Sequence, residues 1–126
     1  MSEVVVVDRL EPAHLAQLVE LFSHQWWTEH RTLERTQAAL ASSSLVLGAV
    51  DRGSDRLIGF TRVLSDGAFV ALVLDVMVAA AWRGRGIGAL LIDAVVSHPS
   101  LGPVESVELV CQPDLVPFYE RWGFTD

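Results

Sequence analysis

The sequence predicts an α/β (α+β) domain with a mixed β-sheet flanked by about four helices. The sheet is expected to be antiparallel in its N-terminal part and parallel near its C-terminal end. Two observations carry this prediction. Three apolar runs are separated only by short turn clusters, at residues 45–50, 57–64 and 69–78, which is typical of an antiparallel meander. A glycine-rich segment, a helical stripe and a further apolar run then follow, which indicates a right-handed crossover between parallel strands.

Residues 4–8 begin with four β-branched valines and predict a short first strand. Pro12 then suits the first turn of a helix, where its missing N–H costs nothing. Apolar residues follow at helical spacing and form one stripe: Leu15, Leu18, Val19, Phe22 and Trp26. We expect Trp26 to complete the buried face of this helix. A second helix is expected over residues 32–41, with Thr32 as its N-cap.

The C-terminal half begins with a glycine-rich segment at residues 83–88. A helical stripe follows it, formed by Ile87, Leu90, Leu91, Ala94 and Val95. A strand is expected over residues 104–111. Asp114 is a candidate N-cap for a last helix that runs through Trp122, and Gly123 suits the end of that helix.

The length of 126 residues predicts a single domain over residues 1–126. The sole cysteine, Cys111, cannot form an internal disulfide, which favours a reducing compartment. The start of the sequence does not resemble a signal peptide. The longest apolar stretch, residues 68–82, is short and is interrupted by Asp75, so we expect no membrane span and a cytoplasmic protein.

The formal net charge is −7, from 16 acidic and 9 basic residues, and every basic residue is arginine. This balance argues against a nucleic-acid partner, because phosphate contacts need a basic face. It is compatible with a cationic small substrate. The four histidines form no cluster with acids or with the cysteine, so we expect no metal site.

The segment 83–88, Arg-Gly-Arg-Gly-Ile-Gly, predicts a phosphate-binding turn. Glycines allow the backbone N–H groups to approach a ligand closely, and the start of a helix favours an anion. Arg83 and Arg85 add positive charge at the same place. The alternative is a plain strand-to-helix turn with surface arginines. A Walker loop is excluded because the chain has no lysine, and a dinucleotide fold would place the loop after the first strand.

Two motifs in the correct order resemble those of the GNAT (GCN5-related N-acetyltransferase) superfamily. The first is Val76-Met77-Val78 followed by Arg83-Gly84-Arg85-Gly86-Ile87-Gly88, and the second is Phe118-Tyr119-Glu120-Arg121-Trp122-Gly123-Phe124. With the expected order of strands, the resemblance covers nearly the whole chain. It implies an acetyl-CoA-dependent N-acetyltransferase that transfers the acetyl group directly to an amine.

The resemblance also implies roles for individual residues. The backbone of Val76, Met77 and Val78 would pair with the pantetheine arm and polarise the thioester carbonyl. The loop residues Arg83, Gly84, Arg85, Gly86, Ile87 and Gly88 would hold the pyrophosphate of CoA. Tyr119, the only tyrosine, corresponds to the usual general acid, which protonates the departing thiolate. Its alternative is an amphipathic helix residue with a buried ring.

Two further residues are candidates for the acceptor side. Asp75 interrupts an apolar strand, where an acid is costly unless it is paired or used. It is therefore either the base that accepts the amine proton, a solvent-facing strand residue, or the partner of an arginine. Trp27 lies in the connection between the first two helices, which helps to wall the acceptor pocket in the family, and is a candidate to enclose the amine.

The chain departs from the family pattern in two places. Many members have an asparagine early in the last helix, whereas Leu115 stands there and the chain has no asparagine. The family usually continues after Gly-Phe with a strand, a loop and another strand, whereas this sequence stops at Asp126. Three explanations fit the stop at Asp126. The gene product is short, the chain is truncated, or a partner subunit completes the sheet. A non-catalytic acyl-CoA-binding sensor or scaffold is therefore the alternative function. Homodimers are common in the family, so a second copy is a partner that the resemblance allows.

Overall fold

The computed structural model describes residues 3–125 and contains the mixed sheet that the sequence predicts. The strands are β1 (Val4–Val7), β2 (Leu45–Asp51), β3 (Arg56–Ser65), β4 (Val70–Val78) and β5 (Ser106–Leu109). The helices are α1 (Pro12–Ser23), α2 (Leu33–Ser42), α3 (Ile87–Val96) and α4 (Val116–Glu120), with three short 3₁₀ turns, η1 (Ala80–Trp82), η2 (Pro99–Leu101) and η3 (Pro113–Leu115).

The five described strands lie in the order β1-β2-β3-β4-β5. The first four pair antiparallel with one another, and β5 pairs parallel with β4. The meander and the strand–helix–strand crossover are therefore confirmed. The last strand is shorter than expected, and its pairing with β4 covers only residues 70–73 of that strand.

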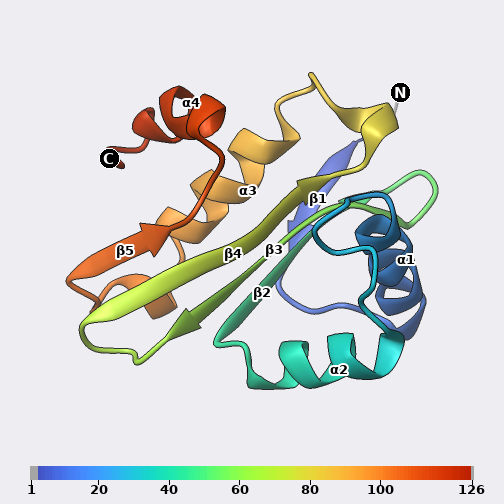
Figure 1. The fold of residues 1–126 in the computed structure, drawn as a ribbon, viewed down its shortest axis with the longest axis horizontal. Coiled ribbons are helices and arrows are strands. Elements are labelled where there is room, and N and C mark those ends of the chain that lie inside the picture. The colour runs from blue at the N-terminus through green and yellow to red at the C-terminus, as the bar shows by residue number, and fades with distance from the viewer. Residues whose placement is uncertain (1–2, 126) are drawn as a thin grey trace.

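The helices cover the two faces of the sheet (Figure 1): α1 and α2 pack on one face, and α3 and α4 on the other. The α1 side buries a small core of Leu18, Phe22, Val50, Leu57, Phe60 and Met77. The α3 side buries the larger core, which includes Leu47, Ala49, Ile58, Val73, Leu91 and Val95. Burial of these side chains supplies the main driving force for folding. It also fixes β4 between two layers.

The starts of the first two helices follow the sequence prediction. Pro12 occupies the first turn of α1, and the hydroxyl of Thr32 accepts a 3.1 Å hydrogen bond from the backbone N–H of Arg35. The prediction for Trp26 was wrong: α1 ends at Ser23, and Trp26 is 75% exposed. The buried hydroxyl of Thr28 donates to the carbonyl oxygen of Phe22 at 2.7 Å. The same carbonyl also accepts from the backbone N–H of Gln25 at 3.2 Å, so two donors hold the tight turn after the helix.

The last helix also differs from the prediction. Asp114 lies in the 3₁₀ turn η3, and α4 begins at Val116 without a side-chain cap. Pro117 suits the first turn of this short helix, since its missing N–H would have no helical partner there. Gly123 has φ +89°, which agrees with its predicted place after the helix end.

A β-bulge in β4 is the feature of the sheet that matters most for the site. The register between β3 and β4 shifts between Phe60 and Arg62, so that Asp75 and Val76 together oppose Thr61. Asp75 has φ +57°, in the left-handed region that aspartate tolerates better than most residues. The hydroxyl of Thr61 donates to the carbonyl oxygen of Leu74 at 2.9 Å. The bulge changes the direction of β4 just before the residues expected to bind the acyl donor.

Within residues 3–125, every helix is too short or too polar to cross a membrane.

Candidate active site

The cleft expected to hold the acyl donor lies where β4 and β5 separate. Strand pairing between them ends at Val73 and Leu109, while β4 continues to Val78 (Figure 1). The edge of β4 from Leu74 to Val78 is therefore open on the β5 side. A cleft of about 630 Å³ lies along this edge. Its walls include Gln25, Trp27, Asp75, Val76, Met77, Val78, Arg83, Cys111, Leu115, Phe118 and Tyr119.

Backbone N–H groups of β4 point into this cleft. The N–H of Ala79 donates to the carbonyl oxygen of Ile58 in β3 at 2.8 Å, so Ala79 faces β3. The backbone N–H and C=O groups of successive residues in a strand point to opposite edges. Those of Val78 and Val76 therefore point to the open edge of β4. The carbonyl oxygen of Val78 accepts a hydrogen bond from Nε of Arg83 at 3.3 Å, which fits this direction. The side chain of Met77 is buried in the core on the α1 side, so Met77 helps to hold the strand in place.

The glycine-rich segment forms the turn between η1 and α3. Gly84 and Gly86 both have φ +78°, and Gly86 is the N-cap of α3. No side chain caps this helix, and its first turn contains no acidic residue. A Cβ at either glycine would meet no atom within 4 Å, so the turn faces open space. Free N–H groups at the positive end of a helix dipole favour an anion there.

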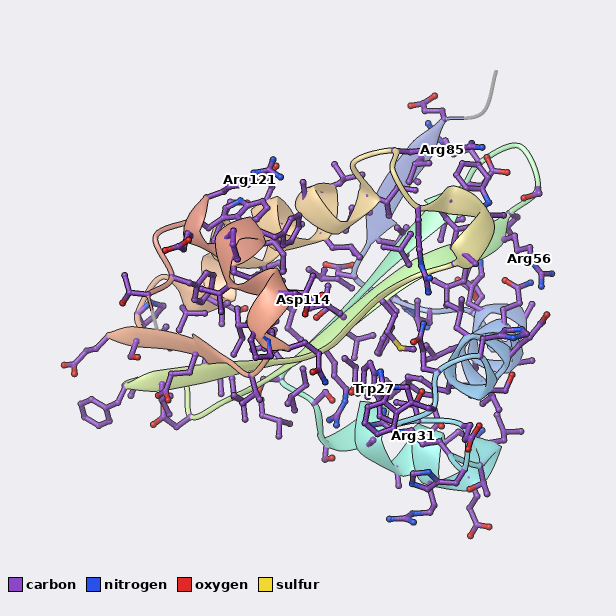
Figure 2. All side chains as sticks on the ribbon, turned by 45° about the horizontal axis from the view of Figure 1, so that its top comes forward. Trp27, Arg31, Arg56, Arg85, Asp114 and Arg121 are labelled. Carbon is purple, nitrogen blue, oxygen red and sulfur yellow. The ribbon has the colours of Figure 1, made fainter. Side chains whose placement is uncertain are left out.

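The arginines and the last glycine of the segment have separate contacts. The guanidinium of Arg85 stacks over the ring of Trp82, with 4.7 Å from its carbon to the ring centroid. Figure 2 shows Arg85 near the start of α3. A Cβ at Gly88 would lie 3.5 Å from the ring of Phe118, which is ordinary van der Waals contact, so Gly88 faces α4. Ile87 is buried in the core and anchors the first turn of α3.

Tyr119 lies in α4 and is 6% exposed. Its ring makes edge contacts with Phe118 and Phe124, and the residue lines the cleft beside Cys111. Burial, with a smaller contribution from the neighbouring Cys111, raises the pKa of Tyr119 to about 12. The phenol therefore keeps its proton throughout the physiological pH range. A protonated hydroxyl at the cleft can donate a hydrogen bond to a developing anion.

Asp75 also lines the cleft, and its side chain is held by two arginines. Arg31 donates from Nη1 at 2.8 Å and from Nη2 at 3.2 Å, and Arg62 donates from Nε at 2.7 Å. The carboxylate is only 5% exposed. Its burial opposes ionisation, but the hydrogen bonds and charges of Arg31 and Arg62 outweigh that effect and hold the pKa of Asp75 below its ordinary value. In this arrangement the carboxylate is a weak base.

These features match a known family. A family model described as an acetyltransferase (GNAT) domain matches residues 11–126. The chain belongs to the GNAT N-acetyltransferase family. It is 27% identical over 122 residues to a protein from Porphyra purpurea described as an uncharacterized N-acetyltransferase, ycf52, with 95% of this chain and 70% of that protein covered. The chain spans 64% and 67% of the next two ycf52 relatives.

Two further similarities extend this comparison. This GNAT chain is 37% identical over 95 residues to a rice (Oryza sativa subsp. japonica) protein named glucosamine 6-phosphate N-acetyltransferase 1, with 71% of the chain and 58% of that protein covered. A crystal structure from Xanthomonas campestris pv. campestris, described as belonging to the GNAT family, superposes with a TM-score of 0.86 at 32% identity. That superposition covers 100% of this chain and 87% of the other.

Trp27 lies in the connection between α1 and α2 of this GNAT domain, as does Arg31 (Figure 2). Trp27 is 39% exposed and lines the cleft together with Gln25 and Asp75. The structure therefore brings Trp27, Asp75 and Tyr119 to one cleft with the open edge of β4. Trp26, its neighbour, is outside the lining of this cleft.

Sequence reasoning missed Arg31 and Arg62, the partners of Asp75. The available signal was an acidic residue inside an apolar strand, which implies a buried counter-ion. Any of nine arginines could have supplied it. Arg31 is 44 positions and Arg62 is 13 positions away from Asp75 along the chain. The docking of the α1–α2 connection against β4 selects Arg31, and the pairing of β3 with β4 selects Arg62.

Proposed function

We propose that this GNAT domain transfers an acetyl group directly from acetyl-CoA to a primary amine of a small molecule or a protein. The observation that carries this proposal is the arrangement of three features around one cleft. The open edge of β4 and the hydroxyl-bearing Tyr119 both line it. Arg83 also lines it and leads through the glycine-rich turn to the uncapped start of α3. The open strand edge suits an extended polar arm, the start of α3 suits a diphosphate, and the hydroxyl of Tyr119 suits a departing thiolate.

The residues divide the work in the following way. The N–H groups of Val76 and Val78 bind the pantetheine arm and polarise the thioester carbonyl, in the manner of an oxyanion hole. The turn from Arg83 to Gly88 holds the pyrophosphate through its backbone N–H groups. Tyr119 donates its proton toward the leaving sulfur. Acetyl-CoA supplies the activated acetyl group.

In this proposal Asp75 mainly positions the bulge of β4, and its action as a base is secondary. Its two arginine partners lower its basicity, and its left-handed backbone forms the bulge that orients Val76. Asp75 becomes a base only if the arginines release it as the amine binds. Trp27 forms one wall of the acceptor end of the cleft, so its replacement by alanine raises the KM for the amine and leaves acetyl-CoA affinity unchanged.

The relatives do not agree on an acceptor. Besides the rice glucosamine 6-phosphate enzyme, they include a soybean protein named histone acetyltransferase TAP1 and a rice protein named serotonin N-acetyltransferase 2, chloroplastic, both 31% identical. These names span a sugar phosphate, a protein and an arylalkylamine. These names therefore do not identify the acceptor of this chain, which must be found by experiment. The cytoplasmic localisation stays a prediction.

Thermal unfolding with and without ligands tests the proposal first. A ligand at about 100 times its Kd adds roughly 2.7 kcal/mol to the stability of the folded state. This raises the midpoint by several degrees for a domain of this size. We expect a shift with acetyl-CoA and CoA, and none with ATP or NADH. No shift with any CoA species would contradict the assignment of the cleft. CoA binding without release of free thiol in a broad amine panel would instead favour a sensor or scaffold.

Replacing Gly86 with alanine tests the phosphate-binding turn. A left-handed non-glycine residue costs about 1–2 kcal/mol of stability, and the added methyl group enters the space assigned to the pyrophosphate. Gly67, in the turn between β3 and β4, has φ +75° and also faces open space, so Gly67→Ala is the matched control. We expect similar stability losses in both variants and weaker CoA binding only in Gly86→Ala, by isothermal titration calorimetry. Equal CoA affinities would remove the turn from the site.

A further inference from the structure

A second, smaller cavity lies on the α2 side of the sheet, apart from the acyl cleft. It has a volume of about 280 Å³ and is lined by residues of α1, α2, the connection between them and β3. Its lining residues are Phe22, His30, Arg31, Arg35, Thr36, Ala39, Leu40 and Arg62. This is enough room for one small polar group and part of the molecule that carries it. We call it the arginine cavity.

The charge of the arginine cavity is unusual for this protein. Three of the nine arginines line it in a chain of formal charge −7. Asp75 neutralises one charge of the Arg31–Arg62 pair, which leaves an excess of two positive charges. Arg35 has no acidic partner within residues 3–125. Clustered guanidinium groups repel one another, and a bound anion relieves that repulsion and accepts their hydrogen bonds.

Thr36 gives an independent indication of a missing polar partner. The residue is 3% exposed and lines the cavity, and its hydroxyl has no hydrogen-bond partner among the described residues. A buried hydroxyl without a partner is destabilising. An anion in the cavity would accept a hydrogen bond from this hydroxyl as well as from the guanidinium groups.

The arginine cavity is connected to the acyl cleft by one ion pair. Arg31 lines the cavity, Asp75 lines the cleft, and their side chains are 2.8 Å apart. A molecule anchored in the cavity therefore lies next to the bulge of β4 that leads to Val76. We propose that the arginine cavity binds an anionic group, a phosphate or a carboxylate, of the amine acceptor. The assignment to the acceptor rests on the function proposed above, whereas the anion site itself does not.

Binding of simple anions to CoA-saturated protein tests the site. Saturation with CoA occupies the glycine-rich turn, so that it cannot take up the added anion. Titration calorimetry with inorganic phosphate and with succinate, at constant ionic strength maintained by chloride, shows which anion is preferred. We expect saturable binding of at least one of them. Failure of both to bind, or phosphate binding that CoA abolishes, would overturn the anion site.

Two variants locate the bound anion. Arg35→Gln should weaken its affinity about 10-fold, because it removes a charge-assisted hydrogen bond. Arg52→Gln changes the net charge equally at an exposed arginine paired with Glu3, and should leave the affinity unchanged. Thr36→Val should raise the unfolding midpoint without anion and also weaken anion binding, which tests the site even if Arg35→Gln folds poorly. Equal affinities in wild type and Thr36→Val would contradict this placement.

Inhibition kinetics test the link to the acceptor. With the amine identified by the thiol-release panel, the bound anion should inhibit competitively against the amine and not against acetyl-CoA. Inhibition that is competitive only against acetyl-CoA, or no inhibition at saturating anion, would overturn the acceptor assignment. A protein that binds anions but releases no thiol with any amine would contradict the proposed function and leave the anion site standing.

Discussion

Replacement of Tyr119 with phenylalanine is expected to lower kcat by about 100-fold or more, as loss of a general acid does. The KM for acetyl-CoA should change little, because the aromatic ring and its contacts with Phe118 and Phe124 are retained. Initial rates of thiol release, together with the CoA-dependent thermal shift, separate the two effects. Since the pKa of Tyr119 is raised to about 12, its ionisation should produce no loss of wild-type activity below about pH 10.

Trp122→Phe is the matched control for Tyr119→Phe. It replaces the neighbouring indole, whose N–H donates to Asp93 at 2.6 Å outside the acyl cleft, with a smaller phenyl ring that has no donor. Its kcat should stay at the wild-type value. Equal kcat in wild type and Tyr119→Phe across the pH range would exclude Tyr119 from the mechanism.

Replacement of Asp75 with asparagine should lower the free energy of unfolding by about 3 kcal/mol at pH 7, since removal of one partner leaves buried charges uncompensated. Asparagine tolerates the left-handed backbone, so this variant isolates the loss of charge opposite Arg31 and Arg62. The folded-state pKa of Asp75 is lowered. Its stabilising contribution is therefore present above the unfolded pKa of about 3.9 and is lost as the pH falls through the folded-state pKa. Urea unfolding at pH 7 and near pH 3 measures the difference in the free energy of unfolding between wild type and Asp75→Asn. This difference should be smaller at the lower pH.

Asp55→Asn is the control, because Asp55 also has a positive φ of 58° but carries an exposed carboxylate. Its effect should stay within about 0.5 kcal/mol, as for most surface substitutions. Equal destabilisation in the two variants would mean that the Asp75 ion pairs contribute nothing to stability.

The same Asp75→Asn variant distinguishes positioning from base catalysis. If Asp75 only positions the bulge and the α1–α2 connection, kcat falls while the midpoint of the acidic limb of kcat/KM stays unchanged. We expect this result, because the two arginines hold the carboxylate as a weak base. Loss of the acidic limb in the variant would instead identify Asp75 as the group that accepts the amine proton.

Local patterns were sufficient to predict much of this protein. The turn clusters around Gly53 and Gly67 predicted the meander, and the alternation of apolar runs with the glycine-rich segment predicted the crossover through α3. These features depend on neighbours a few residues apart, and short-range sterics and hydrogen bonds determine them. The motifs around Gly86 and Tyr119 similarly indicated the family, which the family model confirms.

Helix ends were less predictable, because competing local hydrogen bonds decide them. The apolar spacing around Trp26 fits a longer helix, yet α1 ends at Ser23. The hydroxyl of Thr28 donates a hydrogen bond to the carbonyl oxygen of Phe22 in the turn that follows. Asp114 has the chemistry of a cap, but it lies within the 3₁₀ turn η3, and α4 begins after that turn.

The sequence by itself determined the order of the elements, the family and the residues expected at the acyl-donor cleft. Only the tertiary structure decided which arginines meet Asp75, and that Arg35 and Thr36 enclose a cavity behind them. Such contacts join segments 13 to 44 positions apart. Their partners are selected by the packing of whole layers, in which a buried charge must find an opposite charge wherever the fold brings one.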